Sequence, residues 1–488
     1  MFKRSSAILM HISSLPNNYG IGAFSKEAYD FVDFCKLAGF SYWQILPLNP
    51  TGYGDSPYQS FSTFAGNPYF IDLTELLNEE ELIKADLTTS DNKVDFGKIY
   101  LNKTALLYKA YLLNYDKLKK QIDEFYRNNT EWLIDFALFM ALKKRFKNLP
   151  WQKWDKGIKH RNQGEIEKYK KLLKSDIDFY IFCQYLFFSQ WRRLKDYANI
   201  SGVKIIGDLP IYVSMDSADA WCGKGVLKLN KNLTPKFVAG VPPDYFSKTG
   251  QLWGNPVYNW SNLKKTDYSW WIKRVQSASS MYDVIRIDHF RGFVNYWEVA
   301  GKSPDAVSGK WKRGPGISLF TQIKEDLGEI NIIAEDLGII SDSVSVLRKK
   351  LKLPGMSVLQ FGYDVSDKDN NYTIQNAKKD SVYYIGTHDN DTLFGWYNKL
   401  DEKNKKYVDE CFGLKDKENV NFAIIRAVYA SRCNLVVITM QDILGLESNA
   451  RMNIPSVAYG NWTWRMTKCQ ITDDIISKLK NLAEEFDR

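Results

Sequence analysis

Short apolar runs that end in polar residues recur along the whole chain. Most of them are separated by segments with the spacing of amphipathic helices. The eight runs cover residues 7–11, 42–48, 203–209, 283–288, 330–336, 356–363, 381–389 and 434–442. Strands that alternate with helices eight times are typical of a parallel barrel inside a ring of helices. The pattern therefore predicts an α/β fold, a (β/α)8 TIM barrel that spans residues 1–488 as a single domain.

The spacing of the runs is uneven in two places. Residues 49–202 separate the second run from the third, and their later part carries Leu107, Tyr111 and Leu118 at helical spacing. This predicts a mainly helical subdomain, about residues 75–198, inserted above the barrel. Residues 239–258 read as a long loop, which is typical of a lid or substrate loop. The segment after the eighth run is too short for a C-terminal β-sandwich of about 100 residues.

Composition narrows the class of protein. The chain is 44% hydrophobic and 25% charged, as soluble globular proteins are. The net charge of +9 is spread over Lys-rich helical segments, and no nucleic-acid-binding motif accompanies it. We therefore expect no nucleic-acid partner. Aromatic residues make up 15% of the chain. They either pack in the hydrophobic core or provide flat surfaces on which sugar rings stack.

Cysteine and histidine usage argues against a metal centre. The six cysteines lie far apart, and the chain has four histidines. This combination predicts no zinc site and a reducing compartment. The apolar run at residues 7–10 is too short for a signal peptide, and no run approaches the length of a membrane span. We expect a cytoplasmic protein with no membrane partner, no metal and no cofactor.

Three carboxylates stand at the ends of the fourth, fifth and seventh runs, namely Asp288, Glu335 and Asp389. The carboxyl ends of barrel strands meet on one face, so we expect these three side chains to lie close together there. Cleavage of a glycosidic bond requires carboxyl groups paired in this way. Arg286 lies two residues before Asp288 in a strand, on the same side, and is expected to keep this carboxylate ionised as a nucleophile. Glu335 is then the candidate for the protonated acid. A structural Arg286–Asp288 pair and a helix cap at Glu335 are the alternatives.

The sequence around these acids resembles a known family. Residues 286–292, 334–338 and 386–392 are similar to the catalytic motifs of the amylomaltases, the 4-α-glucanotransferases of glycoside hydrolase family 77 in the α-amylase clan. The resemblance runs nearly end to end. It also covers residues 20–22, 43–48, 54–60, 66–69, 207–211 and 460–465.

The resemblance implies a role for each matching residue. Asp288 would be the nucleophile, Glu335 the general acid/base and Asp389 the transition-state stabiliser. The implied substrate-binding residues are Tyr53, Ser56, Tyr58, Asp208, Tyr245, Phe246, Trp253, Asn255, Arg286, His289 and His388. The implied reaction is a retaining transfer of an α-1,4-glucan segment from one maltooligosaccharide to the 4-hydroxyl of another, or of glucose. The implied intermediate is a covalent glucosyl-enzyme on Asp288, and the protein would be a monomer or a homodimer.

Some positions depart from the family pattern. Lys248 stands where many members have Glu, and residues 373–376 and 454–456 also differ. We expect these changes to affect the preferred size of the product. An α-1,4-glucan hydrolase of the same clan and a non-catalytic glucan-binding protein are the competing hypotheses. A metal-dependent barrel hydrolase would need a His-x-His strand end, which the sequence lacks.

Overall fold

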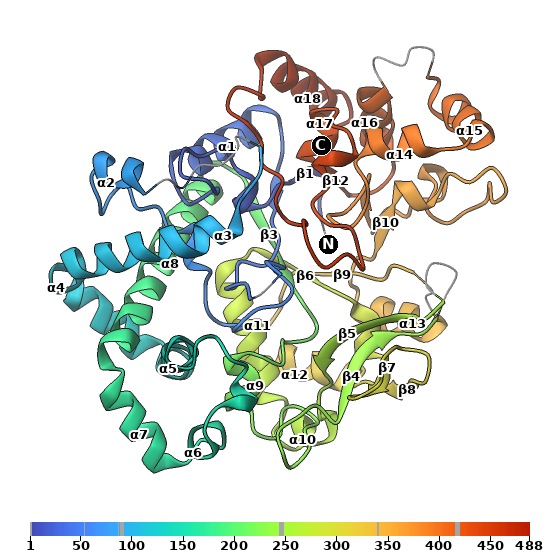
Figure 1. Ribbon diagram of the computed structural model, residues 1–488. Coiled ribbons are helices and arrows are strands. Elements are labelled where there is room, and N and C mark those ends of the chain that lie inside the picture. The colour runs from blue at the N-terminus through green and yellow to red at the C-terminus, as the bar shows by residue number, and fades with distance from the viewer. Residues whose placement is uncertain are drawn as a thin grey trace.

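The computed structural model describes residues 2–52, 54–85, 87, 92–243, 248–338, 341–414 and 420–488, and its centre is a parallel sheet (Figure 1). The eight strands follow one another in the order β10-β11-β12-β1-β2-β3-β6-β9. They are β1 (Ser5–Leu9), β2 (Tyr42–Gln44), β3 (Lys204–Leu209), β6 (Val284–Ile287), β9 (Ile332–Ala334), β10 (Met356–Val358), β11 (Val382–Tyr384) and β12 (Leu435–Thr439). Seven of these strands lie within predicted runs, and β1 begins two residues before its run at residues 7–11. The predicted barrel is confirmed.

Two hydrogen bonds connect the first and last strands of this order. The Ala334 N–H of β9 donates to the Pro354 carbonyl, at 3.0 Å, and the Met356 N–H of β10 donates to Asp336 Oδ1, at 2.7 Å. The strands are buried on both faces, as expected for a barrel with a filled interior and a cover of helices. Gly207 of β3 is needed in this packing, since a Cβ there would lie 2.1 Å from the Tyr282 ring. The result is a nearly closed barrel.

Helices cover the outside of the barrel. Those outside the segment between β2 and β3 are α1 (Lys26–Leu37), α9 (Ala218–Cys222), α10 (Trp260–Lys265), α11 (Ser269–Met281), α12 (Ile317–Leu327), α13 (Asp342–Lys350), α14 (Leu393–Lys399), α15 (Glu402–Phe412), α16 (Val420–Ala430), α17 (Met440–Ile443) and α18 (Asp473–Glu485). After β12 the described residues form no further strand of either sheet. No described helix combines the length and the apolar character that a bilayer span requires.

The segment between β2 and β3 is mostly helical. Its helices are α2 (Glu79–Lys84), α3 (Phe96–Lys98), α4 (Thr104–Asn128), α5 (Leu133–Arg145), α6 (Lys156–Lys159), α7 (Gln163–Leu172) and α8 (Lys174–Ile200). They gather on one side of the barrel in Figure 1. Aromatic contacts join α4 to α8, with ring centroids 5.6 Å apart for Tyr111 and Phe182 and 5.7 Å apart for Phe125 and Phe188. That this segment is a separate subdomain stays a prediction.

A second sheet lies on the other side of the molecule, at the lower right of Figure 1. It is antiparallel, with the order β5-β4-β7-β8, and consists of β4 (Phe237–Val241), β5 (Gln251–Pro256), β7 (Asn295–Ala300) and β8 (Lys310–Arg313). Strands β4 and β5 therefore occupy residues 239–241 and 251–256 of the segment expected to be a loop, and that expectation is wrong for these residues. A role of the segment as lid or substrate loop stays a prediction. The strands are short, and β4 is held by pairing with the distant β7. Periodicity along the chain does not reveal such a pairing.

Candidate active site

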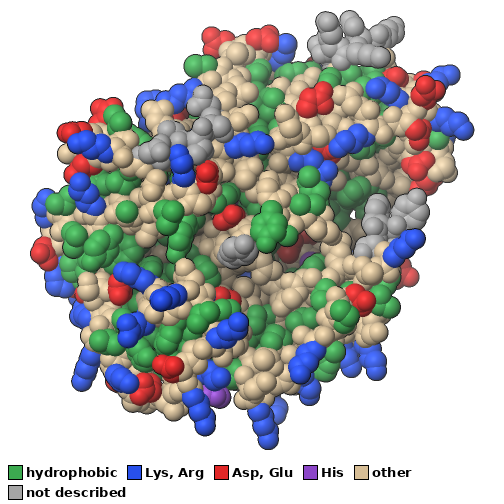
Figure 2. All heavy atoms as spheres, viewed as in Figure 1, with side chains coloured by type: hydrophobic (Ala, Val, Ile, Leu, Met, Phe, Trp, Pro, Cys, Tyr) green, Lys and Arg blue, Asp and Glu red, His purple; other side chains and the backbone are tan. Residues whose placement is uncertain are grey.

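Four barrel strands deliver polar side chains to one end of the barrel. Asp208 lies near the end of β3, Asp288 and Glu335 follow β6 and β9 directly, and His388 and Asp389 follow β11. Figure 2 shows a hollow near the centre of this face, with acidic and histidine side chains inside it. The carboxyl ends of parallel strands meet at the same rim, which explains the convergence.

Contacts link nine of the fourteen predicted site residues. They form a chain in which each residue contacts the next, in the order Trp253, His289, Glu335, Asp288, Arg286, Asp208, Tyr58, His388 and Asp389. Outside this chain of nine, Ser56 bonds the main chain of Tyr58, and Asn255 bonds residues that were not predicted, as shown below. Tyr53, Tyr245 and Phe246 lie outside the described residues.

Arg286 is the buried cation of this cluster. Its Nη1 donates to Asp208 Oδ2, and its Nη2 donates to Glu335 Oε2 at 2.7 Å. Asp288 Oδ1 is farther away, at 4.0 Å from Nη1. Asp208 stands directly opposite Arg286 in the β3–β6 register. Neighbouring strands are about 4.8 Å apart, whereas residues i and i+2 of one strand are about 6.6 Å apart. The guanidinium therefore bonds carboxylates on the adjacent strands more readily than the carboxylate of Asp288 on its own strand.

The pKa values of the two central acids move in opposite directions. Burial and the nearby Glu335 carboxylate raise the pKa of Asp288 well above its usual range. Burial also disfavours the ionised form of Glu335, but the Arg286 charge and hydrogen bonds from Asp288 and the His289 N–H lower its pKa. The two acids are coupled, and a proton is bound more tightly on the Asp288 side than on the Glu335 side. The prediction that Arg286 keeps Asp288 ionised is wrong for this state of the protein, because Arg286 pairs with Asp208 and Glu335.

Asp389 stands at the rim of the cluster. Its side chain is 49% exposed, and its Oδ1 lies 3.3 Å from His388 Nε2 and accepts a hydrogen bond from Asn453 Nδ2 at 2.7 Å. Arg451 Nη2 donates to the Asp389 carbonyl, at 2.9 Å. Sequence reasoning missed Asn453 and Arg451. Their position in the segment after the eighth strand was the available signal, since such segments build barrel sites.

Aromatic side chains form one wall of the site. The Tyr58 ring stacks on His388 with centroids 5.0 Å apart, and its hydroxyl donates to Asp208 Oδ2 at 2.7 Å. Trp462, which sequence reasoning did not assign to the site, lies 5.8 Å from the Tyr58 ring. Stacked rings at this depth offer flat apolar surface beside charged groups, an arrangement that suits a sugar.

His289 connects the second sheet to the acids. The Trp253 ring of β5 contacts the His289 ring edge-on, with ring centroids 4.9 Å apart. The main-chain N–H of His289 donates to Glu335 Oε2 at 3.1 Å. His289 has a left-handed backbone with φ of 46°, which turns the chain directly after Asp288. Burial lowers the pKa of His289 to about 4, so the ring is neutral at neutral pH.

Ser56 and Asn255 are engaged within the protein. Asn255 is buried; its Nδ2 donates to the Val213 carbonyl at 3.0 Å, and its Oδ1 accepts from Gln59 Nε2 at 2.9 Å. Ser56 Oγ accepts from the Tyr58 N–H at 3.3 Å. These contacts fix the loop that carries Tyr58. Direct substrate contact by either residue stays a prediction.

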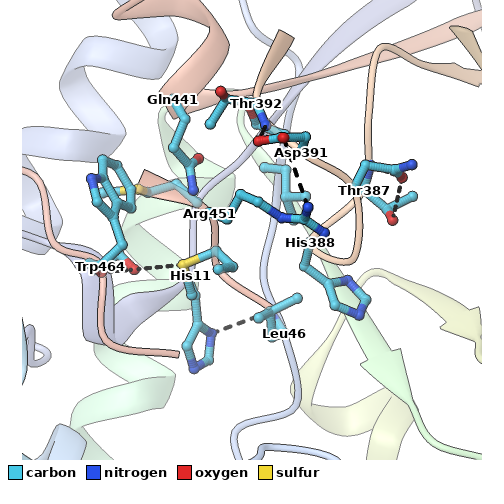
Figure 3. A pocket seen from close by; sticks show the side chains of 15 residues that line it. His11, Leu46, Thr387, His388, Asp391, Thr392, Gln441, Arg451 and Trp464 are labelled. Atoms are coloured by element: carbon cyan, nitrogen blue, oxygen red, sulfur yellow. Dashed lines mark hydrogen bonds and ion pairs between the residues drawn. The ribbon is translucent and has the colours of Figure 1, made fainter. Parts of the chain in front are cut away.

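A small cavity of about 20 Å³ lies behind His388, large enough for one water. Figure 3 shows the Arg451 side chain extending toward Asp391 near the His388 ring, with His11 on the opposite side. Burial and the nearby His388 lower the pKa of His11 to about 3, and its Nδ1 accepts from the Leu46 N–H at 3.3 Å. A neutral His11 therefore backs the site without adding charge.

Among the described residues, no group of three or more His, Cys, Asp or Glu side chains has the arrangement of a metal site. The acids of the cluster are bound to Arg286, to main-chain N–H groups and to one another. The arrangement offers paired carboxylates whose pKa values are shifted in opposite directions, a buried cation and aromatic surface. Such a set can protonate a leaving group and attack a carbon in one site.

Comparison with known proteins agrees with the geometry. A family model described as 4-alpha-glucanotransferase matches residues 10–472. The 4-alpha-glucanotransferase of Clostridium butyricum is 47% identical over 98% of this chain and 100% of its own length. That of Streptococcus pneumoniae strain TIGR4 is 45% identical over 100% of this chain and 98% of its own.

Solved structures give the same picture. The structure of amylomaltase from Streptococcus agalactiae in complex with acarbose has a TM-score of 0.97 and 39% identity, and each chain is fully covered. Amylomaltase from Corynebacterium glutamicum has a TM-score of 0.80 at 16% identity, over 99% of this chain and 75% of its own. At that identity the similarity concerns the fold alone.

Proposed function

The chain belongs to the 4-alpha-glucanotransferase family, and from that premise we propose that it transfers α-1,4-glucan segments between maltooligosaccharides by a retaining mechanism. The acceptor would be the 4-hydroxyl of another glucan or of glucose. The observation that supports this mechanism is the convergence of both carboxylates on Arg286, with Glu335 Oε2 2.7 Å from Nη2 and Asp288 Oδ1 4.0 Å from Nη1, close enough for each acid to shift the pKa of the other. A retaining enzyme places its two carboxyl groups about 5–5.5 Å apart, whereas an inverting enzyme needs about 6.5–9.5 Å between them to hold a water.

The proton shared by these acids sets the first step. Asp288 holds it in the free protein, whereas attack requires an ionised Asp288 and a protonated Glu335. The existing hydrogen bond provides the path for this proton as glucan binds. Glu335 then donates it to the glycosidic oxygen while an Asp288 oxygen bonds to the anomeric carbon, which breaks the glycosidic bond and leaves a glycosyl ester.

The second step reverses the roles. Glu335, now ionised, takes the proton of the acceptor 4-hydroxyl, whose oxygen bonds to the anomeric carbon and displaces Asp288. The proton returns to the acid pair, so the site is ready for another cycle. Arg286 stays charged throughout, and its bonds to Asp208 and Glu335 offset the negative charge of the cluster.

The remaining predicted residues would hold the sugar. Asp389 has an exposed carboxylate at the rim and is proposed to bind the hydroxyls of the glucose unit that reacts. Tyr58 and Trp253 would contact glucose rings, and His289 and His388 would line the donor side. Hydroxyl contacts that tighten as the sugar ring flattens lower the barrier of both steps.

The first test incubates the protein with maltotriose and follows the product ladder and the total number of reducing ends. Transfer gives glucose and longer maltooligosaccharides at a constant number of reducing ends. An increase in reducing ends without longer products would instead establish the hydrolase. Unchanged maltotriose would favour a glucan-binding protein.

The covalent step has a separate test. In Glu335→Gln, a maltooligosaccharyl fluoride can still glycosylate Asp288, because fluoride leaves without a proton, while the second step lacks its base. Intact-mass analysis should then show the added glycosyl mass, located on the peptide that contains Asp288. Asp288→Asn/Glu335→Gln is the matched control and should gain no mass. No adduct on the single variant, with fluoride still released, would contradict the covalent mechanism.

A further inference from the structure

The segment after β12 reaches across to the segment after β11. Asn453 N–H donates to the His388 carbonyl at 3.1 Å, and Arg451 Nη2 donates to the Asp389 carbonyl at 2.9 Å. The same Arg451 nitrogen also donates to the Asn453 carbonyl, at 3.2 Å. Two consecutive carbonyls of the β11 segment are thus fixed by main-chain and side-chain donors from the β12 segment.

The Asp389 carboxylate is held on one side. Its Oδ1 accepts from Asn453 Nδ2 at 2.7 Å and faces His388 Nε2 at 3.3 Å. Within the described part of the chain, no hydrogen bond occupies its Oδ2. A carboxylate anchored through one oxygen cannot rotate freely about its terminal torsion, so the other oxygen keeps one direction.

Arg451 is itself braced from behind. Its Nη1 lies 3.8 Å from Asp391 Oδ2, and that carboxylate oxygen also accepts from Lys399 Nζ at 2.5 Å and from Ser448 Oγ at 2.9 Å. Figure 3 shows the Arg451 side chain directed at Asp391. The Arg451 side chain is 18% exposed, so its position is set by packing as well as by charge.

We infer that Asn453 and Arg451 are positioning residues for Asp389. They fix the carboxylate so that its free oxygen meets the hydroxyls of the reacting glucose unit. This inference rests on the proposed function, because it assigns Asp389 the role of transition-state stabiliser. Preorganised partners of this kind act mainly on the rate of the chemical step, since a misplaced carboxylate weakens the transition state more than the bound substrate.

The test compares variants in the transfer reaction with maltotriose. Asn453→Ala removes a hydrogen bond to a charged group, so kcat is expected to fall about 10- to 100-fold. KM should change little. Asn461→Ala is the matched control, because Asn461 bonds Ile454 and Val457 of the same loop and does not contact Asp389. This control should stay within about twofold of the wild-type kcat.

Two further variants separate positioning from a structural role. Asn453→Asp keeps the shape of the side chain but replaces the donor with an acceptor, so it should lose at least as much activity as Asn453→Ala. A role in packing alone would leave Asn453→Asp near the wild type. In an Asp389→Asn background, Asn453→Ala should cause little further loss, because its target is already disabled. A maltooligosaccharyl fluoride donor keeps these slow rates measurable.

The outcomes distinguish this inference from the proposed function. Wild-type kcat in Asn453→Ala would overturn the positioning role, provided that Asp389→Asn alone still loses most of its activity. Losses that multiply in the double variant would overturn it as well. A fully active Asp389→Asn would overturn the role of Asp389 and this inference together. Thermal unfolding of each variant within a few degrees of the wild type establishes that the losses are not losses of fold.

Discussion

Replacing Arg286 with Gln would remove the cation at the centre of the acid cluster. Arg286 is 2% exposed and faces the carboxylates of Asp208, Glu335 and Asp288. Gln keeps a polar side chain, is two bonds shorter and carries no charge. We expect both activity and stability to become more sensitive to pH, because three buried carboxylates would then lack their compensating charge.

The distances set the size of the effect. At an effective dielectric constant of about 20, a unit charge attracts another by about 6 kcal/mol at 2.7 Å and about 4 kcal/mol at 4.0 Å. Arg286 therefore favours ionised Glu335 over ionised Asp288 by about 2 kcal/mol. Loss of a buried ion-pair partner costs about 3–5 kcal/mol of stability. For a chain of 488 residues this corresponds to a Tm lower by about 3–5 °C.

The sign of the pH effect follows from the same geometry. Arg286 lowers the pKa of Asp208, Asp288 and Glu335, so Arg286→Gln should raise all three. Both limbs of the pH profile of kcat/KM for maltotriose should then move to higher pH. A carboxyl group with a raised folded-state pKa loses stability as pH rises through that pKa. The Tm deficit of the variant should accordingly be smallest near pH 4 and grow toward pH 8.

Arg291→Gln is the matched control, five residues along the chain. Arg291 donates to Asn295 at 3.0 Å and stacks on Trp311 at 4.0 Å, away from the three acids. This control should leave both limbs in place. Coincident pH profiles for Arg286→Gln and the wild type, or a Tm deficit that does not change between pH 4 and pH 8, would refute the assignment of Arg286 as the cation that controls the acid pair.

Three other predictions concern packing and metal dependence. Gly66→Ala would place a Cβ 2.0 Å from the Phe187 ring and should destabilise the fold by about 1–3 kcal/mol, whereas Gly164→Ala in α7, with open space around it, should stabilise it by about 0.5–1 kcal/mol. Equal Tm changes for the two would contradict this reading. Lys143→Met removes a buried ammonium that bonds Asp216 at 2.6 Å and two backbone carbonyls. The free energy of unfolding measured in urea should fall by about 3 kcal/mol, and a fall of less than about 1 kcal/mol would contradict a stabilising role of this ammonium. An excess of EDTA should leave transfer from maltotriose unchanged, and inhibition reversed by a divalent cation would show a metal requirement.

The barrel and the position of its acids follow from the pattern of apolar and polar residues alone. Each strand is an apolar run that ends in polar residues, which is a local pattern, and eight such runs separated by helical segments favour one architecture. Asp288 and Glu335 follow their strands directly, so they had to reach the same end of the barrel. No tertiary information was needed for that conclusion.

Which of these groups pair with one another depends on how the strands pack in three dimensions. Periodicity along one strand placed Arg286 beside Asp288, yet the adjacent strands supply Asp208 and Glu335 at shorter range. Packing therefore decides which carboxylates the Arg286 guanidinium stabilises. The antiparallel sheet and the contact between Asn453 and Asp389 also join segments far apart in the chain. Such contacts depend on how strands and loops are brought together in space, which a local pattern of apolar and polar residues does not encode.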